Sequence, residues 1–406
     1  MSRVVQAAKS VLRPVRSSVN HRFPPLSAYE GSGGTTWFFG SRERAPSIAT
    51  FFSGGDVHRG PRSRVRRHRI PGRIMEIADA GGLTILRVNE PETGLADILH
   101  WAVEVPSLVD IHRDLPADTD TLRAQLVTST TREDFRRIRR ANFTYRVTSD
   151  PDAIREFHAR HYSALVARQF PEDGRVGPLG KMLDQIGEGG ELVCADLDGE
   201  WVAGVYNINR EAHYALTGLG IRDADEAVRQ KRVVAALIIR SLERAVETGH
   251  DLATLGRALP FLGVSGPVFF KSKWGGTITR HPGQVFHIFV DLRHAALRRM
   301  LSASPVIHGE GDELVASTWL EPGDKALQDM VRDSDRYQGI SRWYVLGLPA
   351  TLASGAAQLS AAERIVPVPV TPEGDRPLWL GEALPGSDGE PVAPLDSARE
   401  SAESRT

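Results

Sequence analysis

Cysteine is nearly absent from this sequence, and long apolar runs are absent altogether. A single cysteine, Cys194, among 406 residues excludes a disulfide framework and a CxxC-type zinc site. No stretch approaches the roughly 18–20 apolar residues that a helical bilayer span requires. The first 22 residues also lack the apolar centre of a secretory signal peptide. We therefore expect a cytoplasmic protein that is not embedded in a membrane.

The remaining composition is that of an ordinary globular protein. Hydrophobic residues make up 41% of the chain and charged residues 25%. These values exclude a mostly disordered chain, a collagen-like repeat and a coiled-coil rod. The length predicts two or three domains.

Charge is balanced overall but unevenly distributed along the chain. Lys and Arg total 50 and Asp and Glu 51. Residues 1–70 nevertheless hold thirteen basic and three acidic residues, whereas 371–406 hold eight acidic residues and three arginines. We predict a basic flexible segment over 1–69, which could contact a membrane surface weakly or meet phosphates through its arginines, and an acidic disordered tail over 371–406.

Between these ends the hydrophobic pattern predicts folded structure. Short strands are expected at Ile74–Ala78 and Leu83–Val88, and a helix over Thr121–Ala141. We assign 70–130 to an N-terminal α/β subdomain and 293–370 to a C-terminal extension.

Residues 131–292 show the most regular alternation of elements. The expected order is strand, two helices, three strands, one long helix, one strand, a loop and two more strands. Asp198-Gly199 is a strong hairpin signal between the first two of the three consecutive strands. The pattern predicts an α+β fold with a mixed central sheet. Its three consecutive strands are Glu191–Leu197, Trp201–Asn207 and His213–Gly220, and its long helix is Glu226–Thr248.

This order resembles the GNAT acyltransferase fold, with a long helix after the third core strand. More narrowly, it resembles the branch that groups Fem-type peptidyltransferases with acetyltransferases associated with polysaccharide and cellulose biosynthesis. The resemblance lies in three stretches, RRIRRANFTYRVTSDPDAIREFHARHY at 136–162, ELVCADLDGEWVAGVYNINREAHYALTGLG at 191–220 and PFLGVSGPVFFKSKWGG at 260–276.

The sequence departs from the GNAT pattern at the start of the long helix. GNAT enzymes usually carry Gln/Arg-x-x-Gly-x-Gly/Ala there, and its glycines let backbone N–H groups approach the coenzyme A pyrophosphate. The nearest match here runs from Gln230 to Ala235, with Val233 in place of the first glycine. Fem-type enzymes often lack this motif because their donor is aminoacyl-tRNA.

The resemblance implies direct attack of an amine on an acyl carbonyl, assisted by a donor to the developing oxyanion. The implied donor is a backbone N–H at the end of the third strand, in Leu219, Gly220 or Ile221. Tyr214 and Glu211 are candidate acids or bases on the same strand. Gly218 and Gly220 in this strand are consistent with a bulge or a close backbone approach, and the alternative is a loosely twisted strand end.

Basic residues at two places are candidates to bind an anionic donor. Arg229, Gln230 and Lys231 lie at the start of the long helix, where the helix dipole favours anions. Lys271 and Lys273 alternate on an expected extended run, which would point both toward a phosphate. The alternatives are a solvated helix face and an edge strand guarded by lysines. No metal site is expected.

The favoured function is an N-acyltransferase that moves an acyl group from acyl-CoA to an amine. The acceptor would be an amino sugar, a peptide or a cell-envelope precursor, and no metal is required. One alternative is a Fem-type transferase that uses aminoacyl-tRNA, which the basic residues 59–73 and Arg136–Arg140 suit. The other is a non-catalytic GNAT-like scaffold that binds a partner.

Overall fold

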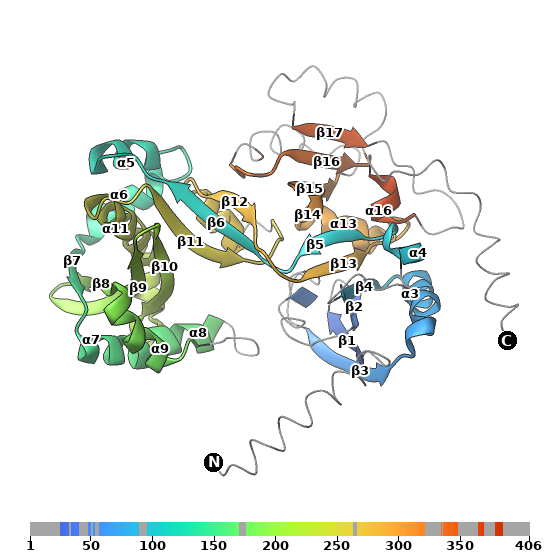
Figure 1. Ribbon diagram of the computed structural model, residues 1–406, viewed down its shortest axis with the longest axis horizontal. Coiled ribbons are helices and arrows are strands. Elements are labelled where there is room, and N and C mark those ends of the chain that lie inside the picture. Colours follow the sequence, from blue (N-terminus) through green and yellow to red (C-terminus); the bar gives the residue numbers. More distant parts are fainter. Residues whose placement is uncertain are drawn as a thin grey trace, which may run out of the picture.

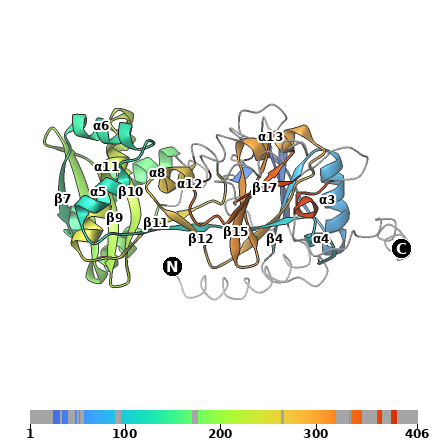
Figure 2. The ribbon, with the colours of Figure 1, turned by 90° about the horizontal axis from the view of Figure 1, so that it is seen from above.

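A computed structural model defines the fold, which contains three β-sheets (Figure 1). The structure describes residues 25–31, 34–39, 48–49, 52, 57–88, 96–169, 176–262, 266–320, 334, 336–347, 364–368 and 378–384. The expectation for the first 24 residues, including membrane contact, lies outside these ranges. Figure 2 shows the central sheet at one end of the molecule and the other two sheets at the opposite end.

The N-terminal sheet has the strand order β3-β1-β2-β4-β13-β5. The predicted flexible segment over 1–69 is therefore wrong for its described part. β1 lies between two neighbours and buries five consecutive residues, so it shows none of the alternation that marks a strand in sequence. The strands are β1 Pro25–Gly31, β2 Gly34–Phe39, β3 His58–Arg64, β4 Leu83–Val88, β5 Val103–Pro106 and β13 Val285–Phe289.

A helix covers this sheet where a strand was predicted. α3, Ile70–Asp79, buries Ile70, Ile74, Ile77 and Ala78, a helical spacing, and has a proline in its first turn. The predicted strand at 74–78 is thus wrong. That prediction did not include Ile70, and the helical spacing of the buried residues is evident only when Ile70 is counted. The short elements η1 Arg67–Arg69 and α4 Ala96–Leu99 flank α3 and β5.

The central sheet has the order β12-β6-β11-β10-β9-β8-β7 and confirms the predicted α+β class. The pairing between β10 and β11 is parallel and the others are antiparallel. The strands are β6 Val109–Asp114, β7 Thr144–Thr148, β8 Gly190–Leu197, β9 Glu200–Arg210, β10 His213–Ile221, β11 Leu252–Ala258 and β12 Thr277–Arg280.

Helices cover both faces of the central sheet. Leu192 and Cys194 of β8 pack against one group of helices, whereas Val193 and Ala195 pack against α11 on the other face. The first group is α7 Pro151–Glu156, η2 Phe157–Tyr162, α8 Ser163–Gln169, α9 Leu179–Asp184 and η3 Gln185–Glu188. The opposite face carries α5 Thr119–Leu126, α6 Arg132–Ala141, α11 Val233–Glu247 and α12 Pro267–Ser272.

Two predicted long helices are each divided in two. The region expected to form one helix over 121–141 forms α5 and α6. The helix expected over 226–248 forms α10, Glu226–Gln230, and α11, following η4, Arg222–Ala224. The break lies at Arg232, whose φ of 69° is left-handed and stops the α-helical path.

A continuous antiparallel ribbon joins the central and N-terminal sheets (Figure 1). β5 and β13 pair in one sheet, β6 and β12 pair in the other, and the Ser107 N–H donates to the Gln284 carbonyl between them at 2.9 Å. β6 therefore joins the GNAT-like sheet although it precedes residue 131, and β13 leaves that sheet although it precedes residue 292. The predicted domain boundaries do not coincide with the sheets.

The C-terminal sheet has the order β14-β15-β16-β17. Its strands are β14 Val306–Glu310, β15 Glu313–Trp319, β16 Arg342–Leu346 and β17 Ile365–Val368, after helix α13 Ala295–Ala303. Part of the predicted disordered tail is folded, since α16, Leu380–Ala383, follows Trp379, which stacks on Trp101 with ring centroids 5.6 Å apart. Aromatic burial overrides the local acidic composition here.

We predict that truncating the ribbon's core residue Ile111 destabilises the fold strongly. Ile111 is fully buried opposite Ile278 in the β6–β12 pair. Ile111→Ala should lower the free energy of unfolding by about 2–5 kcal/mol, measured by urea denaturation. The control Val147→Ala, on exposed β7, should change it by less than about 0.5 kcal/mol. An equal loss of unfolding free energy in both variants would show that the ribbon's core contributes no more to stability than the exposed strand β7 does.

Candidate functional site

The parallel strands β10 and β11 pair over two residues and then part. Tyr214 faces Ala253 and Ala215 faces Thr254, and neither strand pairs with the other beyond these. Each strand is irregular just past this point. β10 shifts register between Leu216 and Gly218, and β11 shifts between Thr254 and Arg257. β10 and β11 therefore stop pairing with each other after Ala215 and Thr254, close to the irregular part of each strand.

The ammonium group of Lys271 lies where the two strands part. Its Nζ donates a hydrogen bond to the Arg257 carbonyl at 2.8 Å. A Cβ placed on Gly256 of β11 would lie 3.5 Å from this Nζ and 3.4 Å from the Leu216 oxygen of β10. Burial lowers the pKa of Lys271 to about 8, against the attraction of Asp110. An ammonium with a pKa well below the usual value for lysine is thus held between the parted strands.

Lys273 has a different environment from Lys271. Its Nζ bonds to the Asp134 carboxylate of α6, which also pairs with Arg232 at 3.2 Å. Asp134 is 5% exposed and Lys273 is 14% exposed. The predicted extended run is wrong, because Pro267 begins a helix that includes Lys271, and Lys273 follows its end. The two lysines therefore do not share the predicted face.

The start of the long helix forms a basic pocket. Gln230 and Lys231 line a cavity of about 390 Å³ together with Arg137, Arg140, Ala141, Leu197 and Asp198. Arg229 instead points to Glu226, with which it forms an ion pair at 2.9 Å. Val233 is fully buried in the core under α11, so its side chain faces the sheet and does not cover this pocket.

Gly220 packs against a helix, and its neighbours remain paired with β9. A Cβ on Gly220 would lie 2.6 Å from the backbone of His161 and Tyr162 in η2. Leu219 and Ile221 pair with Val205 and Ala203 of β9. The bulge at 216–218 lies nearer to the parting of the strands than the predicted 219–221 does.

The two predicted acid or base residues do not lie at the parting. Tyr214 is fully buried and donates a hydrogen bond to Glu191 Oε1 at 2.6 Å. Burial and the Glu191 carboxylate raise the pKa of Tyr214 well above its usual value, which opposes a role as a base. Glu211 is exposed in the turn between β9 and β10.

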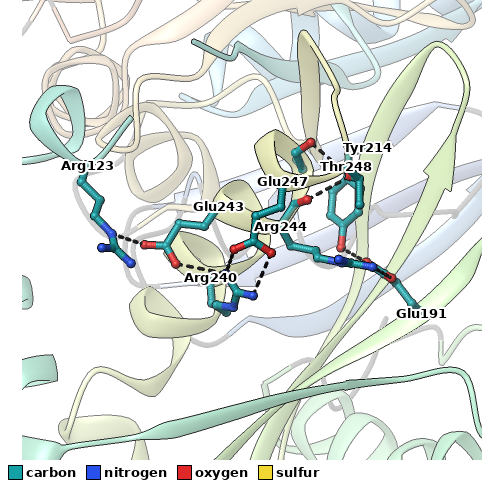
Figure 3. A network of polar contacts seen from close by, with 9 residues as sticks. Arg123, Glu191, Tyr214, Arg240, Glu243, Arg244, Glu247 and Thr248 are labelled. Atoms are coloured by element: carbon teal, nitrogen blue, oxygen red, sulfur yellow. Dashed lines mark hydrogen bonds and ion pairs between the residues drawn. The ribbon is translucent and has the colours of Figure 1, made fainter. Parts of the chain in front are cut away.

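Tyr214 belongs to a polar network that holds α11 on the sheet (Figure 3). Glu191 of β8 also accepts hydrogen bonds from Arg244 of α11 at 3.1 and 3.2 Å. Further along α11, Glu243 accepts from Arg123 of α5 at 2.6 Å. These buried carboxylates are each met by a guanidinium, so they position α11 and leave no charge for chemistry.

Neither a metal site nor a reactive cysteine is found in the part of the chain that the structure describes. In the described part of the chain, no three His, Cys, Asp or Glu side chains are grouped to hold a metal ion. Burial raises the pKa of the Cys194 thiol to about 12, so it is not a thiolate near neutral pH.

Sequence reasoning missed Asp134 and the irregularity in β11, whereas the glycines of the third strand correctly indicated the bulge in β10. Asp134 stands in the arginine-rich run REDFRRIRR, and an acidic residue on the buried side of such a helix was an available signal for an internal ion pair. The irregularity in β11 had only Gly256 as a signal, since irregular pairing depends on the partner strand.

A family model matches the central part of the chain. Residues 128–263 match the family model described as an acetyltransferase (GNAT) domain, which confirms the resemblance inferred from the sequence. The matched stretch contains the central strands β7–β11 and helix α11. No curated protein matches the chain.

Solved structures resemble the chain at low identity. FemX shares 9% identity, with 54% of this chain and 77% of that chain covered and a TM-score of 0.37. L-PGS from Bacillus licheniformis shares 16% (66% and 80% covered, TM-score 0.32). A GCN5-related N-acetyltransferase from Sphaerobacter thermophilus shares 12% (63% and 72% covered, TM-score 0.31). Among the described helices, none has the length and apolar character of a membrane span.

We predict that Lys273 supports stability through Asp134. Lys273→Met would leave a buried carboxylate without its nearest partner, and the free energy of unfolding should fall by about 1–3 kcal/mol. Lys231→Met, at an exposed position, is the matched control and should change it by less than about 0.5 kcal/mol. Equal stability of both variants in urea denaturation would show that the Asp134 pair contributes nothing.

The pKa of Lys271 predicts a pH dependence of stability. Its value of about 8 in the folded protein lies below the usual 10.5, so the unfolded chain holds this proton more tightly. Stability should therefore rise between about pH 8 and 10.5 as the folded state escapes the buried charge. The difference in unfolding free energy between parent and Lys271→Met should shift in the parent's favour over this interval.

The control for this measurement is Gln230→Met, which introduces the same side chain without removing a titrating group. Its difference from the parent should stay constant from pH 7 to 10. A constant difference for Lys271→Met as well would contradict the lowered pKa.

Proposed function

We propose that this protein transfers an acyl group from an activated donor to an amine by direct attack in a ternary complex. The reaction would occur where β10 and β11 part. The observation that supports this most is the Lys271 ammonium held between these strands. Its position suits a group that stabilises negative charge on an acyl carbonyl oxygen.

The reaction requires a positively charged hydrogen-bond donor for the carbonyl oxygen and a route by which the amine loses a proton. The amine nitrogen attacks the carbonyl carbon, and the carbonyl π electrons move to oxygen. Lys271 retains N–H groups beyond the one given to Arg257, and with a pKa of about 8 it is mostly charged at neutral pH. The tetrahedral intermediate then collapses, the bond to the leaving group breaks, and the amine proton passes to that group or to water.

A backbone donor would assist Lys271. We assign it to the bulge between Leu216 and Gly218, where β10 no longer pairs with β11. The sequence placed this role at Leu219–Ile221, with Gly220 at its centre, and the contact of Gly220 with η2 supports a packing role there. Tyr214 and Glu211 have no part in this proposal.

The proposed donor is an acyl-CoA. The basic pocket that Gln230, Lys231, Arg137 and Arg140 line lies at the start of the long helix, where GNAT enzymes bind the coenzyme A pyrophosphate. Asp198 is the acidic residue in this lining. The acceptor would be an amine of an amino sugar, a peptide or a cell-envelope precursor.

A second candidate donor is aminoacyl-tRNA. The observation that favours it is β3, an exposed edge strand with the sequence HRGPRSR, followed by the arginine-containing η1. Exposed arginines on an accessible strand suit contact with a phosphate backbone. The chemistry at Lys271 would be the same, with a ribose hydroxyl as the leaving group.

A thermal-shift series distinguishes these donors. Acetyl-CoA or a longer acyl-CoA should raise the melting temperature of the full chain, and Lys231→Gln should reduce this shift by weakening pyrophosphate binding. Stabilisation by aminoacyl-tRNA alone would favour the second candidate. Stabilisation by none of them would overturn transfer from either donor and favour the non-catalytic scaffold.

We predict that Lys271 acts in the chemical step. Lys271→Met should lower kcat about 100-fold or more and change donor affinity little, because one oxyanion donor is lost. The parent rate should fall as the pH rises through about 8, since the charged form is needed. Lys181→Met, outside the site, is the control. Parent-like turnover of Lys271→Met, or a rate that rises through pH 8, would refute this role.

A further inference from the structure

A histidine and a carboxylate form a hydrogen-bonded pair next to the residues that hold Lys271. His281 follows the end of β12, and its Nδ1 lies 2.7 Å from Oδ2 of Asp110 on β6. The side chain of His281 is 19% exposed and that of Asp110 is 22% exposed. Both are therefore partly buried but within reach of solvent. Neither residue has a role in the mechanism described above.

The hydrogen bond determines which ring nitrogen of His281 can act as a base. An ionised carboxylate only accepts hydrogen bonds, so Nδ1 of the neutral ring carries the proton and Nε2 holds a free lone pair. Within the part of the chain that the structure describes, Nε2 makes no hydrogen bond, and it is not one of the buried polar atoms without a partner. The lone pair is therefore accessible to a ligand.

Asp110 connects this pair to Lys271. It lies opposite Arg257 in the pairing of β6 with β11, and its Oδ1 lies 3.4 Å from Nε of that arginine. The carbonyl oxygen of Arg257 accepts the hydrogen bond from Lys271 Nζ. Burial lowers the pKa of Lys271, and the charge of Asp110 opposes this effect. The pair and the ammonium are thus neighbours across one strand pairing.

The pair lies on the open face of β6, β11 and β12. Ile111 and Leu255 pack in one core cluster with α11 and α12, and side chains alternate along a strand, so Asp110 points to the opposite face. Other side chains on this opposite face are half-buried or exposed, including those of His112, Thr254, Arg257 and Thr279. A substrate can therefore approach these three strands from that side.

The acyl donor and the amine would reach the parting of β10 and β11 from different faces. The proposed donor pocket is lined by α6, which packs on the same face as α11. An amine that meets the donor at the parting then comes from the open face, where His281 lies. Tyr214 is buried and Glu211 lies in a turn, so neither is placed to take a proton there.

We propose that His281 takes the proton of the attacking amine, directly or through one water, and that Asp110 holds the imidazole in the tautomer this requires. The inference rests on the acyl transfer proposed above. As the nitrogen–carbon bond forms, the proton passes to Nε2 and its bonding electrons stay on nitrogen. Asp110 stabilises the imidazolium, which returns the proton to the leaving group or to water when the intermediate collapses.

NMR of the full chain labelled with ¹⁵N-histidine tests the tautomer without any substrate. At pH 8 the signals of His281, assigned by their loss in His281→Gln, should show a proton on Nδ1 and none on Nε2. In Asp110→Asn this preference should be lost, because an amide can donate to Nδ1 as well as accept from it. A proton on Nε2 in the parent overturns the proposal.

Release of coenzyme A from acetyl-CoA, with glucosamine or glycyl-lysine as the acceptor probe, tests the role in the reaction. His281→Gln should lower kcat about 100-fold, because the base is lost. It should also remove the fall in rate that a histidine base produces between about pH 8 and 5. Asp110→Asn should lower kcat about tenfold or more through the wrong tautomer.

His100→Gln is the matched control, since it makes the same change at a position that is 38% exposed between α4 and β5. It should retain the rate and pH profile of the parent, and thermal unfolding checks that each variant is folded. If Lys271→Met loses turnover but folded His281→Gln behaves like the parent, the role of His281 is overturned and the proposed function stands. If the parent releases no coenzyme A with either acceptor, the proposed function fails and this inference is overturned with it.

Discussion

The structure depends on the antiparallel ribbon that β5–β6 forms with β12–β13. β5 and β13 belong to the N-terminal sheet, and β6 and β12 belong to the central sheet. Each sheet therefore contains strands that lie far apart in the sequence. β6 separates β11 from β12, and α12 connects β11 to β12 on the same side. The ribbon therefore fixes the helix that carries Lys271.

A second constraint keeps the parting of β10 and β11 from closing. α11 connects these parallel strands, and its position is set by Glu191 and Glu243, buried carboxylates that meet Arg244 and Arg123 (Figure 3). Each strand also shifts register against its other neighbour, β10 against β9 and β11 against β6. Because the polar network holds α11 in place, β10 and β11 stay parted beyond Ala215 and Thr254.

The sequence predicted what depends on local pattern and missed what depends on distant partners. The order of strands and helices around α11 follows from periodicity and turn signals, and it was predicted correctly. β6 joins the central sheet and β13 joins the N-terminal sheet, contrary to the predicted boundaries. Nothing in either strand's own sequence indicates this, since a strand's sequence does not specify which sheet it joins. Lys271 and Lys273 were predicted to lie on one extended run, and that part was wrong. The helix that begins at Pro267 gives the two side chains different directions.

The fate of the basic residues shows why charge in the sequence is a weak guide to a site. Arg229, Arg232 and Lys273 all belonged to promising basic motifs, and each faces a carboxylate of the same protein. Such ion pairs stabilise helix ends and the contacts between helices. Because the carboxylate neutralises the positive charge, little electrostatic attraction is left for an anionic ligand. Lys271 differs because its main partner is a carbonyl oxygen, which satisfies one N–H without cancelling the charge. A half-buried cation that a neutral group holds in place keeps its electrostatic effect for a substrate, and this property separates Lys271 from the lysine two residues away.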